Sequence, residues 1–152
     1  MSKRVRRTRK GIKVDLPTEE RDLLREIVGQ MRDVLAAGDD PALERLYPVA
    51  YVKDEAREEE WKALIRSELA DHHAAALDTL ATTADAELLD DEQAGAWLRA
   101  LNQIRLLLGT RLEVTEDGTE RPASDDDPRA APFALYDYLA FLQDQLVDAL
   151  AT

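Results

Sequence analysis

The sequence predicts a mainly α-helical fold, a bundle of about four main helices with a short N-terminal β-hairpin. Apolar residues recur three and four positions apart over several long segments, which is the spacing of one buried helix face. The composition, 45% apolar and 34% charged, is typical of a soluble, well-solvated helical protein. The length of 152 residues suits one domain with one hydrophobic core. We therefore expect residues 1–152 to form a single domain.

Residues 1–16 are expected to form a basic arm or hairpin. On one side of Gly11, Val5, Arg7 and Arg9 alternate with polar neighbours. On the other side, the apolar residues Ile12, Val14 and Leu16 occupy alternate positions. Alternation is the pattern of a β-strand, so a turn is predicted around Lys10 and Gly11. The basic side chains would then face solvent, while Val14 and Leu16 lie against the helices.

The helical body is predicted over residues 17–112, and its first helix runs from Pro17 to about Ala37. Acidic residues in the first turns complement the helix dipole, and Gly38 is a typical terminator. The apolar stripe of this helix consists of Leu23, Leu24, Ile27, Met31, Val34 and Leu35.

A short connector and a long helix are expected next. Asp40 caps a brief connector helix, and Pro48 stops it. From Asp54, a helix of about 27 residues would reach about 40 Å. Its apolar stripe is predicted to point inward, and it consists of Trp61, Leu64, Ile65, Leu69, Ala76, Leu77 and Leu80.

Two further helices, separated by an acidic loop, complete the predicted bundle. The third helix is predicted from Glu87 to Leu112. Residues 113–132 are rich in acids, Gly, Pro and Ser, which indicates a loop. The C-terminal helix, residues 133–150, carries leucines three and four apart, namely Leu135, Leu139, Leu142 and Leu146. This spacing supplies the last face of the bundle.

Two polar residues interrupt the leucine stripe of the third helix. Arg105 falls seven residues from both Leu98 and Leu112, where an apolar side chain would be expected, and Asn102 is three residues before it. A buried guanidinium requires a partner, because an unpaired buried charge costs several kcal/mol. We favour a structural network that ties this helix to an acid, the candidates being Glu44, Asp54 and Glu113. A ligand or partner site at the same residues is the alternative.

The charge is unevenly distributed, and the basic arm is the one candidate contact for nucleic acid. The formal net charge is -12, yet the first fourteen residues hold seven basic groups and no acid. The remaining residues carry 13 basic and 32 acidic groups, a body that repels phosphate. The candidate nucleic-acid contacts are Arg4, Arg6, Arg7, Arg9 and Lys10. The alternative is that these charges belong to a solvated tail or to the surface of the hairpin.

Several kinds of chemistry are not expected. Cysteine is absent, which excludes disulfides, thiol catalysis and Cys-type zinc sites within this chain. Glu68, His72 and His73 are close in sequence, but a zinc site needs at least three ligands in a shaped pocket, so no metal site is predicted. The nucleotide, acyl-transfer and zinc-hydrolase motifs are missing, so we expect no enzyme, no catalytic residue and no cofactor. No apolar run reaches membrane-spanning length and no secretory signal is apparent, so we expect no membrane partner and a cytoplasmic location.

Three ordered motifs resemble an actinobacterial family. They are DPALERLYPVAY (40–51), LRALNQIRLLLGTRLEVTED (98–117) and YDYLAFLQDQLVDAL (136–150). The family is catalogued as a domain of unknown function, its members are commonly encoded beside the Clp protease adaptor, and some are named oxidative stress transcriptional regulators, AosR. The resemblance implies a basic short-strand start and a helical body. It also matches a polar set in these motifs: Arg45, Asn102, Arg105, Thr110 and Arg111.

The resemblance further implies a regulatory role. Cysteine-based redox sensing, attached to some members, cannot be carried over to a chain without cysteine. The leading hypothesis is a non-enzymatic cytoplasmic regulatory protein that acts through protein contacts, with transcriptional regulation as the specific role considered. The resemblance implies transcription or Clp-linked machinery as the partner. Two alternatives stay open: direct DNA binding through the basic arm, and a small-molecule binding or catalytic domain that uses Asn102 and Arg105.

Overall fold

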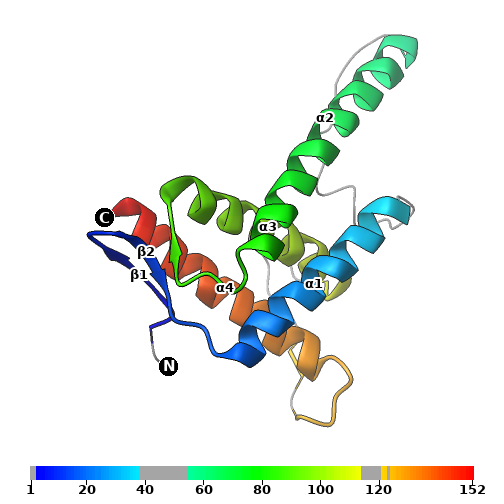
Figure 1. Ribbon diagram of the computed structural model, residues 1–152. Helices are drawn as coiled ribbons and strands as arrows, with labels where there is room; N and C mark the ends of the chain where they lie inside the picture. Colours follow the sequence, from blue (N-terminus) through cyan, green and yellow to red (C-terminus); the bar gives the residue numbers. More distant parts are fainter. Residues whose placement is uncertain (1–2, 38–54, 114–120, 123) are drawn as a thin grey trace.

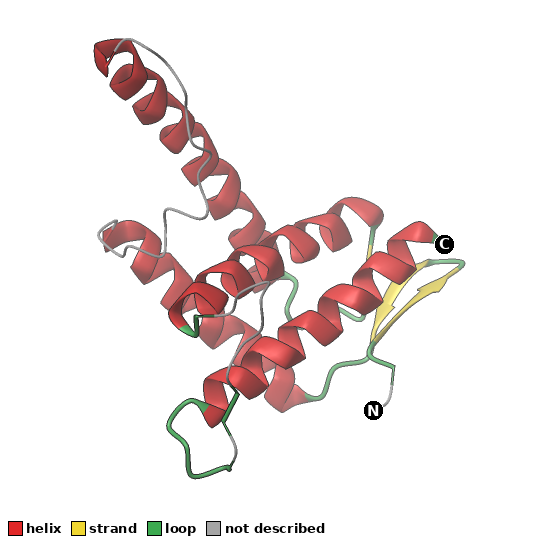
Figure 2. Ribbon diagram, turned by 180° about the vertical axis from the view of Figure 1, so that it is seen from behind, coloured by secondary structure: helices red, strands yellow, loops and turns green. Residues whose placement is uncertain are grey.

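The computed structural model describes residues 3–37, 55–113, 121–122 and 124–152, and within the long helix it omits the side chains of residues 55–58, 61–62 and 65–66. Two strands and four helices of this part of the chain, with one further two-residue strand, form the fold that Figures 1 and 2 show. In chain order the elements are β1 (Val5–Thr8), β2 (Gly11–Val14), α1 (Thr18–Ala37), α2 (Glu55–Thr82), β3 (Leu88–Leu89), α3 (Asp91–Arg111) and α4 (Ala130–Ala151). The mainly α-helical class with an N-terminal hairpin is confirmed.

The predicted hairpin forms, but its turn is at Arg9 and Lys10, one residue before the expected position. Val5 pairs with Val14 and Thr8 with Gly11, and the apolar residues of both strands are buried against the helices. Gly11 has a φ of 139°, and a Cβ there would lie 2.9 Å from the carbonyl oxygen of Leu89. Only glycine allows this close approach of the turn to the third strand.

The third strand corrects the predicted start of the third helix. Leu88–Leu89 pairs with Ile12 and Lys13 as β3, so the sheet order is β1-β2-β3. The helix begins only at Asp91, because Asp90 forms a capping box with Gln93. The Asp90 carboxylate accepts a hydrogen bond from the Gln93 amide at 2.7 Å, and the Gln93 side chain accepts one from the Asp90 amide at 3.0 Å. The Asp-x-x-Gln spacing is a local signal for this start.

Helix α2 corrects a second prediction, since only its C-terminal part has an inward face. Ala76, Leu77 and Leu80 are buried in the core, but Leu64 is 57% exposed. In Figure 1, the first half of α2 extends away from the other described helices. At 3.6 residues per turn, Leu64 lies about 140–160° around the helix axis from Leu77 and Leu80, so the predicted apolar residues do not form one face.

The core lies where α1, α3, α4 and the end of α2 meet under the sheet. Trp97 is fully buried, and its indole N–H donates to the Thr83 hydroxyl at 2.6 Å. The buried face of α3 is centred on Trp97, Leu101 and Ile104, so Leu98 and Leu108 of the predicted stripe lie at its margin, partly buried. The leucines predicted for α4 are buried at Leu139, Leu142 and Leu146.

Some predictions lie outside the described residues. They are the terminator Gly38, the connector with its caps Asp40 and Pro48, Arg45 of the matched set, the acids Glu44 and Asp54, and most of the loop after Glu113. Among the described helices, none is long and apolar enough to cross a membrane.

Candidate functional site

Arg105 lies at the junction of α3 and α4. Its Nη1 donates to the Gln143 side-chain oxygen at 2.7 Å, and the guanidinium carbon is 5.1 Å from the centre of the Tyr136 ring. Gln143 is itself buried, and its amide nitrogen lies 3.5 Å from the Asn102 side-chain oxygen. The two polar residues singled out in the sequence are thus brought together through one glutamine of α4.

The described residues test only one of the expected acidic partners of Arg105. Glu113 does not take part in this arrangement, and the other two candidate acids lie outside the described residues. Arg105 is only half-buried, so water still solvates part of the charge, and a neutral amide with an aromatic face suffices in place of a carboxylate. Asn102 is exposed. Asn102 and Arg105 therefore lie where α3 contacts α4. This position is consistent with a structural role in docking α3, here onto α4.

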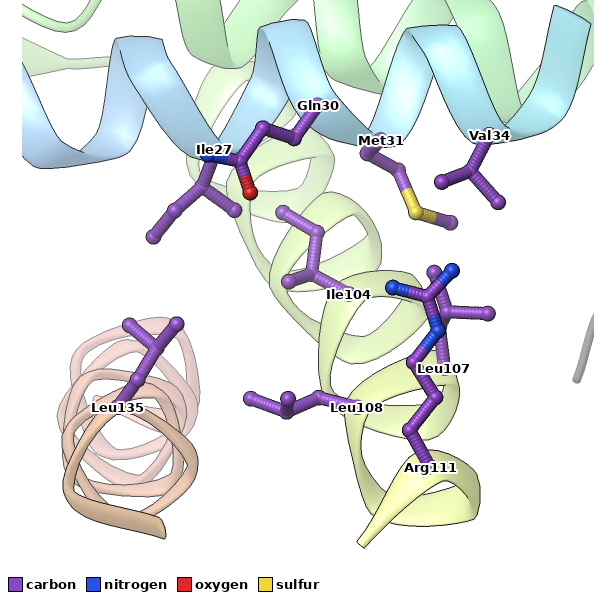
Figure 3. Close-up of a pocket in the computed structure, with 9 residues that line it drawn as sticks. All are labelled: Ile27, Gln30, Met31, Val34, Ile104, Leu107, Leu108, Arg111 and Leu135. Atoms are coloured by element: carbon purple, nitrogen blue, oxygen red, sulfur yellow. The ribbon is translucent and has the colours of Figure 1, made fainter. Parts of the chain in front are cut away.

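A pocket of about 80 Å³ opens between α1, α3 and α4 (Figure 3). Its walls are mainly aliphatic, and its one charged side chain is Arg111 of the matched set. Figure 3 shows the Arg111 guanidinium extending from the end of α3 toward Met31 and Val34 of α1. The lining residues are Ile27, Gln30, Met31, Val34, Ile104, Leu107, Leu108, Arg111 and Leu135.

The side chains that line this pocket suit binding better than catalysis. Arg111 and Gln30 are its polar side chains, so it lacks the acid–base pair or activated nucleophile that general catalysis uses. An arginine beside an aliphatic hollow suits a partner group that presents an apolar side chain next to a carboxylate. Thr110, its neighbour in the matched set, instead donates to the Leu106 carbonyl oxygen at 2.9 Å within the helix.

The predicted nucleic-acid contacts divide into two groups. Arg6, Arg9 and Lys10 are exposed, as expected for a solvent-facing basic surface. Arg4 and Arg7 differ from the expected exposure to solvent, because they are partly buried against the helical body. They lie at the edge of β1, where α1, α3 and α4 supply acceptors for their guanidinium groups.

Arg4 pairs with Glu20 of α1, with Nη2 3.0 Å from the carboxylate, and this contact raises the pKa of the arginine. Arg7 pairs with Asp91 of α3 at 2.7 Å and donates to the Ala149 carbonyl oxygen at 3.1 Å. The hydrogen bond from Arg7 lowers the pKa of the Asp91 carboxyl. These two charges therefore fix the hairpin to the body.

Two residues that the sequence analysis did not single out complete this attachment. Arg21 of α1 donates to four backbone carbonyl oxygens, those of Leu16 (2.9 Å), Ala84 (2.8 Å), Ala86 (2.9 Å) and Val14 (3.0 Å). Gln145 of α4 accepts from the amides of Arg4 and Val5 at 2.6 and 2.7 Å. Side-chain patterns could not have identified them, because their partners are main-chain atoms, most of them from segments more than 60 residues away.

The remaining candidates form no site in the described part of the chain. His72 is exposed on α2. The search of the described residues for groups of three or more metal-ligating side chains finds none. Tyr138 of α4 is partly buried, and burial raises the pKa of its phenol, with the Glu20 carboxylate contributing in the same direction.

The sequence matches a known family model over residues 2–150, described as "Domain of unknown function (DUF2017)". It is similar to the "Oxidative stress regulator AosR" of Mycobacterium bovis and of Mycobacterium tuberculosis, with 34% identity over 143 residues in each case. The alignment covers 83% of this chain and 65% of each relative, so the chain spans about 65% of the length of these curated relatives. No solved structure matches the chain.

Proposed function

Because the chain belongs to the DUF2017 family, we propose that it is a regulatory protein of the oxidative stress response, acting through protein contacts and without catalysis. The observation that carries the proposal is the 34% identity to mycobacterial proteins named oxidative stress regulators. The chain itself lacks cysteine, so in this protein the response would depend on a partner and not on a thiol of its own.

The pocket between α1, α3 and α4 is the surface that supports protein contacts best. It combines aliphatic walls with a cationic rim, the pattern of an interface anchor point. Its size of about 80 Å³ suits one inserted side chain, not a drug-sized ligand. We propose that a partner segment inserts an apolar side chain here and sets a carboxylate against Arg111.

Affinity capture with the full chain from an actinobacterial lysate tests the proposal. Components of the transcription or Clp-linked proteolysis machinery should be recovered, and Arg111→Glu should reduce their recovery by reversing the charge at the rim. Arg9→Glu is the matched control, since it reverses an exposed arginine on the hairpin. Circular dichroism checks that both variants are folded. Recovery of neither class of component would count heavily against the proposal.

Direct DNA binding through the hairpin is a second candidate, supported by its exposed cations. Lys3, Arg6, Arg9 and Lys10 are exposed, whereas Arg4 and Arg7 are engaged with the helices. These four exposed charges, of which Arg6 lies 3.9 Å from the Asp15 carboxylate, predict a slope of log affinity against log salt no steeper than about -4. A fluorescence anisotropy titration over a range of salt concentrations measures it.

The variant for this test should keep the hairpin folded. Deletion of residues 1–13 would remove Val5 and Ile12 from the core, so the triple substitution Arg6→Ala, Arg9→Ala, Lys10→Ala is preferable. It should abolish the salt-dependent binding, while Arg32→Ala, Arg99→Ala, Arg121→Ala, with the same change in net charge, should not. No retention of DNA by the full chain at low salt would exclude this candidate.

A further inference from the structure

The pocket between α1, α3 and α4 contains the one internal sulfur atom of this chain. The sequence holds no cysteine and two methionines, Met1 and Met31, so Met31 is the single sulfur-bearing residue after the first position. Met31 belongs to α1, and its side chain lines the pocket. Sulfur is the atom of a protein that two-electron oxidants attack most readily, so Met31 is the residue through which such an oxidant would change this pocket.

The thioether of Met31 is enclosed by the fold but borders a space that small molecules fit. Met31 is only 2% exposed, and it belongs to the hydrophobic core. The pocket beside it has a volume of about 80 Å³, several times the roughly 10–15 Å³ that one water molecule needs. Hydrogen peroxide, with two oxygen atoms, is little larger than water. The pocket is therefore large enough for this oxidant, although larger reagents are kept from the sulfur.

The sulfur lies next to the cationic side chain of the pocket. Figure 3 shows the Met31 side chain extending from α1 and the Arg111 guanidinium extending toward it from the end of α3. The nearby Val34 and Leu107 are aliphatic. A thioether is a weak hydrogen-bond acceptor, whereas oxidation turns it into a polar group with an acceptor oxygen. An oxygen added to Met31 would thus have a guanidinium donor beside it.

We propose that Met31 is a site of reversible oxidation and that its sulfoxide closes the pocket to a partner, an inference that rests on the binding role proposed above for this pocket. The sulfur attacks one oxygen of hydrogen peroxide, so an S–O bond forms and the O–O bond breaks. Sulfur loses two electrons to the peroxide. The proton of the transferred oxygen passes to the departing hydroxide, which leaves as water. Methionine sulfoxide reductases reverse the oxidation.

The sulfoxide changes both features that the pocket offers to a partner. Its oxygen takes up part of the small volume in which an apolar side chain would lie. It also accepts a hydrogen bond from Arg111 and so competes with the carboxylate of the partner. Among aliphatic walls a polar S–O group is costly unless a donor satisfies it, and this cost favours the contact with Arg111. Oxidation should therefore release the partner.

Peptide mapping by mass spectrometry, after hydrogen peroxide treatment of the full chain, tests the oxidation step. A sulfur that reacts only through global unfolding is slowed relative to the unfolded chain by the folding equilibrium constant, about 10³ or more. Met31 should be slowed by much less, since peroxide reaches it through the pocket. The same reaction in urea gives the unfolded rate, and denaturation gives the equilibrium constant. Slowing by the full equilibrium constant would overturn the proposal.

A small probe tests the effect of the sulfoxide on the pocket. N-acetyl-leucine carries an apolar side chain beside a carboxylate, the chemistry proposed for the partner. At millimolar concentration it should shift the methyl NMR signals of Ile27 and Leu135, two lining residues, in the reduced chain. N-acetyl-leucinamide, which lacks the carboxylate, should shift them less. Oxidation of Met31 should abolish the shifts that N-acetyl-leucine causes.

Two variants separate the sulfoxide from general damage. Met31→Leu keeps an apolar side chain of similar volume, so it should bind N-acetyl-leucine before and after peroxide treatment. Met31→Gln puts a polar group at the same position and should not bind it. Thermal melts check that each form is folded.

The outcomes distinguish this inference from the proposed function. Binding that survives oxidation of Met31 overturns the inference and leaves the proposed function standing. Binding lost from peroxide-treated Met31→Leu, or oxidation that unfolds the chain, does the same. Absence of N-acetyl-leucine binding to the reduced chain overturns the inference and the binding role of the pocket together.

Discussion

The hairpin attachment and the α3–α4 junction use arginine in opposite ways. At the hairpin, Arg21 satisfies four backbone carbonyl oxygens, and Arg4 and Arg7 pair with carboxylates of the helices. At the α3–α4 junction, Arg105 makes one bond to an amide oxygen and covers an aromatic ring, within a contact that is otherwise apolar. The arginines that link the hairpin to the body thus meet carboxylates or several carbonyl oxygens, whereas Arg105 meets two neutral groups.

The difference teaches that the number of the partners together with their exposure to water, and not the apparent polarity of the segment, decides what an arginine contributes to stability: the Asp91 partner of Arg7 is 66% exposed. A guanidinium that satisfies several main-chain acceptors leaves all of them unpaired when it is removed. A half-buried guanidinium with one neutral partner leaves little behind, because water replaces it. This contrast orders the expected effects of substitution.

Arg21→Ala should give the largest loss of stability. It leaves four partly buried carbonyl oxygens of three segments without their donor, and we expect a loss of about 3 kcal/mol in the free energy of unfolding. Chemical denaturation measures it. Arg21→Lys should recover only part of the loss, since an ammonium cannot span the same four acceptors. A loss below that of Arg105→Ala would contradict the comparison.

Gln145→Ala should rank second. Its side-chain oxygen accepts from two consecutive amides at the edge of β1, and its removal should cost about 2 kcal/mol. Hydrogen exchange should also show faster exchange at the amides of Arg4 and Val5 than in the wild type. The neighbouring Asp144→Ala, at an exposed position of the same helix, serves as the control. Equal effects of the two variants would show that the amide bonds add nothing to hairpin attachment.

Arg105→Ala should cost less, about 1 kcal/mol, and it separates a structural role from a ligand site. A double-mutant cycle with Gln143→Leu measures the coupling between the two side chains, which should account for most of the loss. Unchanged stability together with a lost binding activity would favour the alternative of a small-molecule site at Asn102 and Arg105.

Arg7→Ala should have the smallest effect on stability, and it is best followed by titration. Because Arg7 lowers the pKa of Asp91, its removal should return that pKa toward the ordinary value of about 3.9. A lowered carboxyl pKa adds stability above the unfolded pKa and loses it as pH falls through the folded pKa. The variant and the wild type should therefore converge in stability below about pH 4. NMR titration of the Asp91 side chain provides the measurement, and an unshifted pKa would rule out the ion pair in solution.

The regular elements could be predicted from the sequence because their signals are local. The bounds of α1, Thr18–Ala37, follow from Pro17 and the apolar period, and the existence of the hairpin follows from the alternation on the two sides of Gly11. The short strand β3 could not be predicted, since two residues carry no period and Leu88–Leu89 becomes a strand only by pairing with β2. The Asp-x-x-Gln spacing of the capping box is visible in the sequence. It would have moved the predicted start of α3 from Glu87 to Asp91.

The candidate site was predictable in part. Helical spacing correctly put Asn102 and Arg105 on one face, but their partner Gln143 is 38 residues from Arg105 in sequence. The matched motif singled out Arg111 in the sequence. The pocket that Arg111 lines could not be predicted, because α1 and α4 supply its other walls. The division into one domain, the absence of catalysis and the cytoplasmic location stay predictions.

The sequence by itself determined the family, the helical class and the exclusion of thiol chemistry within this chain, because motifs, periodicity and residue counts are properties of the chain order. The tertiary structure decided which charges are engaged and which apolar residues are covered. Arg7 meets Asp91 across 84 residues of sequence, and among the apolar residues of α2 Leu77 is buried whereas Leu64 is exposed. The physical reason is that burial and ion pairing depend on what folds against a residue, and a local pattern specifies a face without specifying its neighbour.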